Sequence, residues 1–458
     1  MAGIGFALRK LARRDDLLGI IECYAHSALV SAGPWMFTVL AVGGINLIGG
    51  QLTTINEIGT YRIALIYNFA FSLVFSGPLV IVATRYLADL IYTKRVAEAP
   101  GMLLAGLGIL YLVSTPPVAW FYFSVAKMSD PMRIATIVNF HLVSGIWMVG
   151  LYLTALKDFR SITYAFAIGM AASFLGGIAL VERFGALGLM GGFDIGLAVI
   201  LFSLISRVFA EYPYPIQRPF AFLGYFGRYW DLALAGLAYN VAIWIDKWVM
   251  WFAPEQEAMG GMISFPDYDS AMFLAYLTIV PALAVFIVSI ETDFFEHYQR
   301  FYKDIQGHAN LDRIRRNHKA LIQSLLDSAR NVIVLQACIA GAAILVAPGL
   351  FDAMGIPATQ LGIFRFGVLG ALFHVMLLFV GIVLAYFDLR RHMLMLQLLF
   401  MVSNGVLSWV TLKMGFAWYG YGYFIATVLT LVVGYAVAAR EVARLPYLTF
   451  VRNNASLN

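Results

Sequence analysis

Charged residues are scarce in this chain. Only 12% of its 458 residues are Asp, Glu, Lys or Arg, whereas 61% are hydrophobic. Soluble domains carry about 25% charged residues, so this composition excludes an ordinary soluble globular protein. The mean hydropathy of +0.80 predicts an integral membrane protein instead.

Cysteine and nucleotide-binding motifs are also missing. The two cysteines, Cys23 and Cys338, both lie in apolar runs, which excludes a disulfide framework. No Gly-Lys dipeptide occurs, so the chain has no P-loop for ATP or GTP. The sequence therefore predicts neither an ATPase nor a disulfide-stabilised fold.

Acidic and histidine clusters that would indicate catalysis are lacking too. The segment 267–269 reads Asp-Tyr-Asp and resembles a glycosyltransferase motif, but the short loop around it leaves no room for a nucleotide-sugar domain. His26, His141 and His374 are isolated within apolar runs and lack the spacing of a metal site. We predict a protein that is not an enzyme and that uses neither a cofactor nor a metal ion.

Long apolar runs dominate the sequence. Runs long enough to cross a bilayer lie at roughly 18–48, 64–90, 101–123, 134–156, 162–182, 187–207, 231–253, 271–292, 329–348, 362–387, 393–413 and 419–439. A cytoplasmic N-terminus places most of the 31 Lys and Arg residues on the cytoplasmic side. We predict an all-α membrane protein of twelve helices with both termini cytoplasmic. Because topology accounts for the net charge of +5, we expect no nucleic-acid partner.

A proline-rich connector separates the chain into two halves. Prolines at 213, 215 and 219 make this segment stiff and extended. It predicts an N-terminal six-helix bundle at 1–207, a linker at 208–230 and a C-terminal six-helix bundle at 231–458. Pro78 and Pro281 lie at matching positions of the halves, and Pro34 lies midway along the first span. Such interruptions predict flexing of the lobes and a site between them.

The seventh predicted span carries an acid and a base. An unpaired charge at bilayer depth costs about 2.5–3.5 kcal/mol, so Asp246 and Lys247 need water, each other or a polar substrate. Asn240, Trp244 and Lys247 share one helical face. An amide, an ammonium and the indole rings of Trp244 and Trp248 suit a sugar better than a lipid tail. The alternative is structural, with Lys247 paired to Asp246 or extended towards the interface.

Three residues of the first span are added to this substrate path. Glu22 and His26 have the i, i+4 spacing of a pair near the inner end of the span. Trp35 lies deeper and offers another ring face for a sugar. All three are candidates on position alone.

The longest cytoplasmic segment, 293–329, has the periodicity of amphipathic helices. It holds six Lys and Arg residues, and four of them are candidates for a partner or membrane surface, namely Arg313, Arg315, Arg316 and Lys319. One interpretation places these helices on anionic lipid of the inner leaflet. The other makes them a docking surface for a cytoplasmic partner.

Several blocks of sequence resemble the PelG family of membrane transporters in bacterial Pel exopolysaccharide systems. Among them are Met-Ala-Gly-Ile-Gly-Phe at 1–6 and Trp-Ile-Asp-Lys-Trp at 244–248. Further blocks lie at 8–11, 31–35, 76–78, 84–86, 291–295 and 298–302. The resemblance implies a twelve-helix member of the multidrug/oligosaccharidyl-lipid/polysaccharide exporter superfamily, in which two six-helix bundles enclose a cavity.

The same resemblance implies a function and partners. It implies export of an N-acetylhexosamine-rich polysaccharide across the bacterial inner membrane. It also implies work beside a cytoplasmic glycosyltransferase and membrane partners that include a cyclic-di-GMP receptor. No set of catalytic residues is carried over from the family, so the site residues above rest on their chemistry alone.

Three other functions remain open at this point. A cation-coupled small-molecule antiporter needs a compact acidic site, which Asp246 or Asp194 would supply. A non-transporting scaffold would anchor a polysaccharide synthase through residues 293–329. A membrane-embedded glycosyl- or acyltransferase is disfavoured because the sequence lacks an acidic catalytic loop.

Overall fold

The computed structural model describes residues 33–34, 36–156 and 159–452. Its described residues fall into two packing units, which divide between Pro266 and Asp267. Within the described ranges, nine helices are long and apolar enough to cross a bilayer. The prediction of an all-α, multi-pass membrane protein is therefore confirmed.

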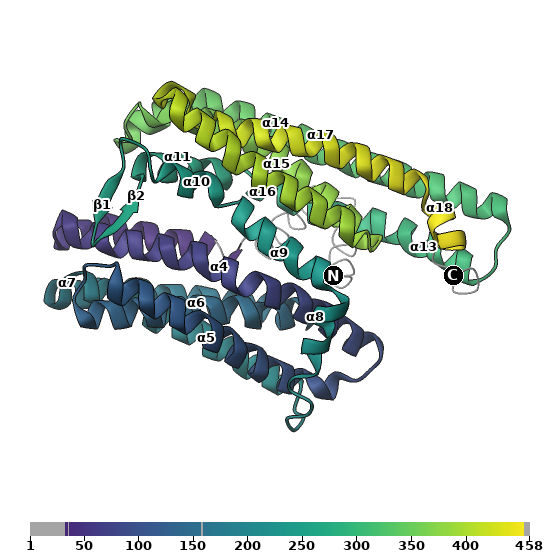
Figure 1. Ribbon diagram of the computed structural model, residues 1–458, viewed down its shortest axis with the longest axis horizontal. Coiled ribbons are helices and arrows are strands. Elements are labelled where there is room, and N and C mark those ends of the chain that lie inside the picture. The colour runs from purple at the N-terminus through teal and green to yellow at the C-terminus, as the bar shows by residue number, and fades with distance from the viewer. Residues whose placement is uncertain (1–32, 35, 157–158, 453–458) are drawn as a thin grey trace, which may run out of the picture. The chain divides into compact units, whose positions relative to one another are not determined.

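The first unit is built around four long helices (Figure 1). A short π-helical segment η1 (Ile45–Gly49) and α3 (Gly50–Leu52) lead to α4 (Ile55–Tyr92), η2 (Val96–Glu98), α5 (Ala99–Ser124), α6 (Asp130–Leu156) and α7 (Phe159–Glu211). α6 packs against α4, α5 and α7. A capping box fixes the start of α4, because Thr54 accepts the Glu57 backbone N–H while the Glu57 side chain accepts from Thr54.

α7 is a helical hairpin rather than one straight rod. Gly185 has φ 56° and ψ −132°, a conformation that interrupts the helix and favours glycine. The arms on either side pack closely, since a Cβ on Gly192 would lie 2.1 Å from the Gly177 nitrogen. Ser173 Oγ also donates to the Phe193 carbonyl across the arms at 3.1 Å. The two arms occupy the predicted spans at 162–182 and 187–207.

The remainder of the first unit includes its only strands among the described residues. After Glu211 come η3 (Ala221–Leu223), α8 (Gly224–Arg228), α9 (Trp230–Ala242), α10 (Ile245–Met250), β1 (Glu257–Met259) and β2 (Met262–Ser264). The strands pair antiparallel with Glu257 opposite Ser264. Gly260 and Gly261 form the turn, with φ 57° and 76°, values that suit a tight two-residue hairpin. The sequence analysis missed this hairpin.

The second unit consists of helices throughout its described part. These are α11 (Pro266–Leu277), α12 (Val280–Ser289), the π-helical η4 (Ile290–Phe294), α13 (Phe295–Gln306), α14 (Leu311–Met354), α15 (Gln360–Tyr386), α16 (Arg390–Met414), η5 (Phe416–Trp418), α17 (Tyr421–Ala443), α18 (Leu445–Tyr447) and η6 (Leu448–Arg452). α17 packs against α15 and α16, and α15 packs against α14. Gly355, at φ 66°, ends α14 in the left-handed conformation.

Three local features explain why the described residues contain nine long helices where twelve membrane spans were predicted. The predicted span 18–48 lies partly outside the described residues, and the adjoining helix 36–52 is short. The two arms of α7 form a single assigned element, and the predicted span 231–253 is divided into α9 and α10. Twelve helices and two cytoplasmic termini stay predictions.

The boundary between units differs from the predicted linker. α9 packs against α4 within the first unit, whereas the sequence analysis grouped residues 231–253 with the C-terminal bundle. The proposed membrane bundles at 1–207 and 231–458 stay predictions, because packing units and membrane lobes need not divide at the same residue.

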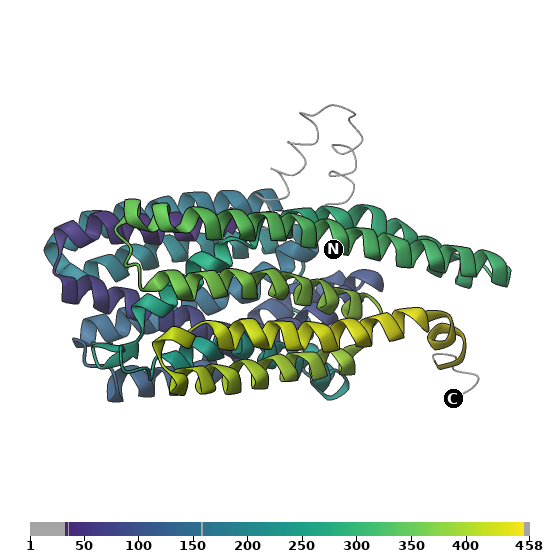
Figure 2. The same ribbon diagram turned by 90° about the horizontal axis from the view of Figure 1, so that it is seen from above.

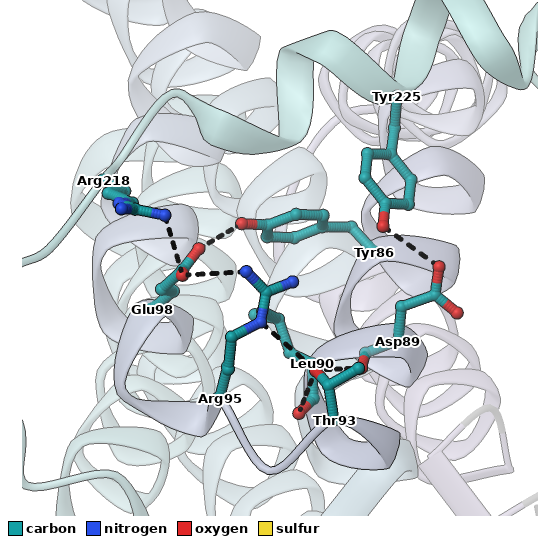
Figure 3. Close-up of polar contacts among 8 residues, drawn as sticks. All are labelled: Tyr86, Asp89, Leu90, Thr93, Arg95, Glu98, Arg218 and Tyr225. Carbon is teal, nitrogen blue, oxygen red and sulfur yellow. Dashed lines mark hydrogen bonds and ion pairs between the residues drawn. The ribbon is translucent and has the colours of Figure 1, made fainter.

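The proline-rich segment is attached to the ends of α4 and α5 (Figure 3). Glu98 is buried and accepts a short hydrogen bond from Tyr86. The same carboxylate lies 3.7 Å from Arg95 and 3.8 Å from Arg218 of the linker. Tyr225 donates to Asp89 at 3.1 Å. Burial and the neighbouring Asp89 carboxylate raise the pKa of Tyr225. The phenol therefore stays protonated and acts as a hydrogen-bond donor.

This attachment predicts the protease sensitivity of the linker. Glu98→Ala removes the acceptor of Tyr86 and the partner of Arg218, a loss of about 1 kcal/mol that raises the open population roughly fivefold. We therefore expect faster chymotrypsin cleavage after Phe220, an exposed residue of the linker. Glu211→Ala is the matched control, because Glu211 is exposed and its ion pair among the described residues is the exposed one with Arg207 at 3.5 Å. Equal cleavage of the Glu98 variant and the wild type would show that this cluster does not hold the linker.

Candidate transport site

The seventh predicted span is interrupted beside its charged residues. α9 ends at Ala242 and α10 begins at Ile245, with no proline at the break. Lys247 Nζ donates to the Ile243 carbonyl at 3.1 Å, so the lysine side chain reaches back to the interrupted turn. The break thus places a backbone carbonyl and an ammonium together within an apolar segment.

Asp246 and Lys247 form a buried ion pair. The Asp246 side chain is fully buried and that of Lys247 is 7% exposed. Lys247 Nζ lies 3.2 Å from each carboxylate oxygen and 5.7 Å from the centre of the Trp244 ring. Desolvation costs both ions several kcal/mol, which their attraction offsets only in good geometry. The predicted local pairing is therefore present, and the substrate contact of these residues stays a prediction.

Aromatic rings of α4 stack on Trp248 of α10 and on Trp251, the residue that follows α10. Trp248 stacks on Phe71 at 5.0 Å and 6°, and Trp251 stacks on Tyr67 at 4.6 Å and 13°. The Trp248 indole N–H is buried without a hydrogen-bond partner among the described residues. One face of the Trp248 ring is thus already covered, while its unpaired donor is a polar group that a ligand oxygen would satisfy.

Asn240 stabilises the helix that carries Pro78. Its Nδ2 donates to the Leu73 carbonyl at 2.8 Å, five residues before the proline. α4 continues through Pro78 without interruption. Gly77 permits this approach, since a Cβ there would lie 2.2 Å from Asn240 Nδ2. Asn240 therefore has a structural contact in addition to its predicted place in the path.

The matched prolines have unequal effects. α11 ends at Leu277, and Pro281 lies in the first turn of α12, where a missing N–H costs little. Of Pro78 and Pro281, only Pro281 therefore lies at a helix interruption. Pro34 is half-buried, and its carbonyl accepts from Thr38 Oγ1 at 2.9 Å. Glu22, His26 and Trp35 lie outside the described residues.

A second buried polar network joins α4, α5, α6 and α7. Asn139 Nδ2 donates to Asp194 at 2.7 Å, and Asn68 Nδ2 donates to Asn139 Oδ1 at 2.9 Å. Tyr122 OH completes the chain by donating to Asn68 Oδ1 at 2.7 Å. The buried hydroxyl of Tyr61 has no hydrogen-bond partner among the described residues. Asp194 is only 8% exposed, so the network holds a carboxylate deep within the first unit.

Sequence reasoning found Asp194 but missed the three residues that connect to it. Asn68, Asn139 and Tyr122 belong to three different helices and are each surrounded by apolar sequence. A lone amide within an apolar span is itself a signal, because it needs a partner on another helix. The partner's identity requires the fold.

The two described histidines within spans are held by hydrogen bonds. His141 Nδ1 lies 2.7 Å from the Ile137 carbonyl, and its Nε2 lies 2.7 Å from Thr115 Oγ1. His374 Nδ1 lies 2.8 Å from the Tyr423 hydroxyl, in the second unit. Both histidines are thus hydrogen-bonded to neighbouring groups within their own packing units.

Comparison with known proteins places this fold among transporters. Residues 1–450 match a family model described as PelG: Putative exopolysaccharide Exporter (EPS-E). A crystal structure of MATE in complex with MaL6 is similar over 92% of this chain and 97% of its own, with TM-score 0.64 and 14% identity. A MOP superfamily transporter from Pyrococcus furiosus covers 92% and 96%, with TM-score 0.63 and 14% identity. No curated protein matches the chain. At these identities the structural likeness shows a MATE-like transporter fold.

Proposed function

The chain belongs to the PelG family of exopolysaccharide exporters, and on that premise we propose that it translocates an N-acetylhexosamine-rich polysaccharide, Pel, from the cytoplasm to the periplasm across the bacterial inner membrane. The family match over residues 1–450 carries this proposal. The MATE-like fold supports transport rather than catalysis.

The polar groups at the α9–α10 break suit such a polymer. Acetylated amino sugars present hydroxyl and amide groups but no charge on the acetylated nitrogen. Lys247 Nζ can exchange one of its acceptors, the Ile243 carbonyl, for a sugar oxygen while it keeps Asp246. The buried Trp248 N–H is a further donor. Individual contacts of this kind contribute about 0.5–1.5 kcal/mol, weak enough for the polymer to keep moving.

The proposal includes the other predicted path residues and the partners. Glu22, His26 and Trp35 extend the path along the first span. Pro34, Pro78 and Pro281 provide flexing of the lobes. The chain works beside a cytoplasmic glycosyltransferase and membrane partners that include a cyclic-di-GMP receptor. It is not itself an enzyme, and polymerisation or an ion gradient supplies the energy.

A deletion strain with an intact synthase tests this function. We expect polymer to accumulate on the cytoplasmic side of the inner membrane and external polymer to fall at least tenfold, because the only missing step is translocation. Polymer is quantified separately on the two sides of that membrane. Complementation with the wild-type chain is the control. Undiminished external polymer would overturn the proposal, and the absence of polymer on both sides would favour a scaffold needed for synthesis.

The Asp194 network favours one other candidate, a cation-coupled small-molecule antiporter. Asp194 has the Asn139 amide as a hydrogen-bond partner and interacts electrostatically with Tyr61, whose hydroxyl has no hydrogen-bond partner in the described part of the chain. Together they form a compact acidic site. Proton- or sodium-dependent efflux by the purified protein in vesicles would distinguish this function, since a translocator driven by polymerisation shows none.

A further inference from the structure

The amphipathic segment 293–329 buries its apolar faces within the protein. Phe301 of α13 and Leu321 of α14 are fully buried, and Ile314 and Leu325 are nearly so, in one apolar cluster. α13 packs along the N-terminal part of α14, as Figure 2 shows in green. An amphipathic helix that lies on a bilayer keeps its apolar face for lipid. The apolar faces of this helix pair are already occupied.

Polar contacts fix the pair as one rigid projection. Asp304 of α13 is buried and forms an ion pair with Arg313 at 2.9 Å and a short hydrogen bond with Asn317. His318 Nε2 donates to the Val442 carbonyl at 2.8 Å, which ties α14 to the end of α17. Arg313, one of the four predicted surface cations, is therefore a structural residue.

The length of α14 carries the remaining cations away from the bilayer. Between Arg330 and Asp352 the helix has no charged residue, and that stretch matches the hydrocarbon thickness of about 30 Å. Arg315 and Lys319 precede Arg330 by about 22 Å and 16 Å along the helix, and by roughly 17 Å and 13 Å along the membrane normal even at a 40° tilt. Headgroups occupy only about 5–8 Å of that distance, and charge attraction is screened beyond about 8 Å.

Three cations stand exposed on this projection. Arg315, Arg316 and Lys319 form no ion pair or hydrogen bond within the described part of the chain. They line a shallow depression together with Asp312 and His318. Their positive charge is concentrated on a rigid surface that anionic lipid reaches poorly.

We propose that Arg315, Arg316 and Lys319 form a docking surface for an acidic surface of a cytoplasmic protein. The proposal rests on the proposed function, in which residues 293–329 lie on the cytoplasmic side of the membrane. Charge complementarity selects an acidic partner, and the distance from the bilayer selects protein over lipid. A preformed surface on α14, held in place by α13, loses little backbone conformational entropy on binding.

Site-specific photo-crosslinking in native cells tests the proposal. The probe is p-benzoylphenylalanine at Gln323, an exposed position about one turn from Lys319 on the same helix. We expect a protein adduct whose crosslinked segment is rich in Asp and Glu. The combined variant Arg315→Glu, Arg316→Glu and Lys319→Glu should reduce this adduct at least tenfold relative to chain abundance, because each attraction becomes a repulsion.

The control makes the same charge change at other exposed cytoplasmic positions, Lys94→Glu, Arg228→Glu and Arg440→Glu, and should leave the adduct unchanged. A lipid adduct, an adduct without acidic residues, no adduct, or one that persists in the first variant would each overturn the docking surface. The readout is a crosslink rather than exported polymer. Failure of docking is thus distinguishable from failure of the export function.

Discussion

Asp246→Asn should lower polysaccharide export roughly tenfold, a loss that corresponds to about 1.4 kcal/mol in the limiting barrier. The fully buried carboxylate lies against Lys247 at the interrupted helix, so its charge sets how firmly the ammonium is held. Asparagine keeps one carbonyl oxygen for Lys247 Nζ but removes the counter-ion of the buried ammonium, which destabilises the chain as well. Export is therefore compared per chain present in the membrane. External polymer and membrane abundance are measured in the same cells.

Two further variants separate transport from structure. Asp231→Asn is the matched control, because Asp231 is a buried acid of the same predicted span that accepts its own neighbour's N–H, from Leu232, at 3.0 Å. It should leave export unchanged. The double variant Asp246→Asn with Lys247→Gln removes both charges and should not restore export. Normal export by Asp246→Asn at normal abundance would exclude Asp246 from the substrate path, and full rescue by the double variant would assign the pair a purely structural role.

Gly192→Ala should reduce membrane abundance about tenfold, because overpacking of this kind costs roughly 1–3 kcal/mol or more. The added methyl group would lie 2.1 Å from the Gly177 nitrogen and 2.4 Å from the Gly176 carbonyl carbon. Both contacts are with backbone, so no side chain can move aside and the arms of α7 must separate. Abundance in membranes and thermal stability in detergent check the prediction.

The neighbouring glycine provides the control. A Cβ at Gly191 meets nothing within 4 Å. Alanine is favoured over glycine in a helix by about 1 kcal/mol, so Gly191→Ala should be neutral or stabilising. Opposite signs at adjacent positions would localise the effect to the contact between the arms. Equal stability of the two variants would contradict close packing of α7.

Sequence patterns predicted the features that depend on local chemistry. Apolar runs indicated both arms of α7, and adjacency made Lys247 the natural partner of Asp246. Periodicity predicted that 293–329 is helical. Helix interruption was predicted at prolines, yet α4 passes through Pro78 while the chain breaks between Ala242 and Ile245 without one. Proline positions alone therefore do not locate the helix interruptions.

Features that depend on distant residues were beyond the sequence patterns. The Asn68–Asn139–Asp194 chain joins residues from three helices, and hydropathy does not specify which polar groups meet. Likewise, the amphipathic periodicity of α13 and α14 does not say whether their apolar faces meet lipid or each other. The Gly260-Gly261 dipeptide was the one local signal for the missed β-hairpin.

The continuity of α14 has a mechanical consequence. One unbroken helix of 44 residues connects the apolar stretch to the part of α14 that packs against α13. Such a helix acts as a lever, since a tilt of about 15° in its membrane part moves a point about 22 Å further along by roughly 6 Å. Any tilting of this helix during transport would therefore displace Arg315, Arg316 and Lys319, together with a protein bound to them.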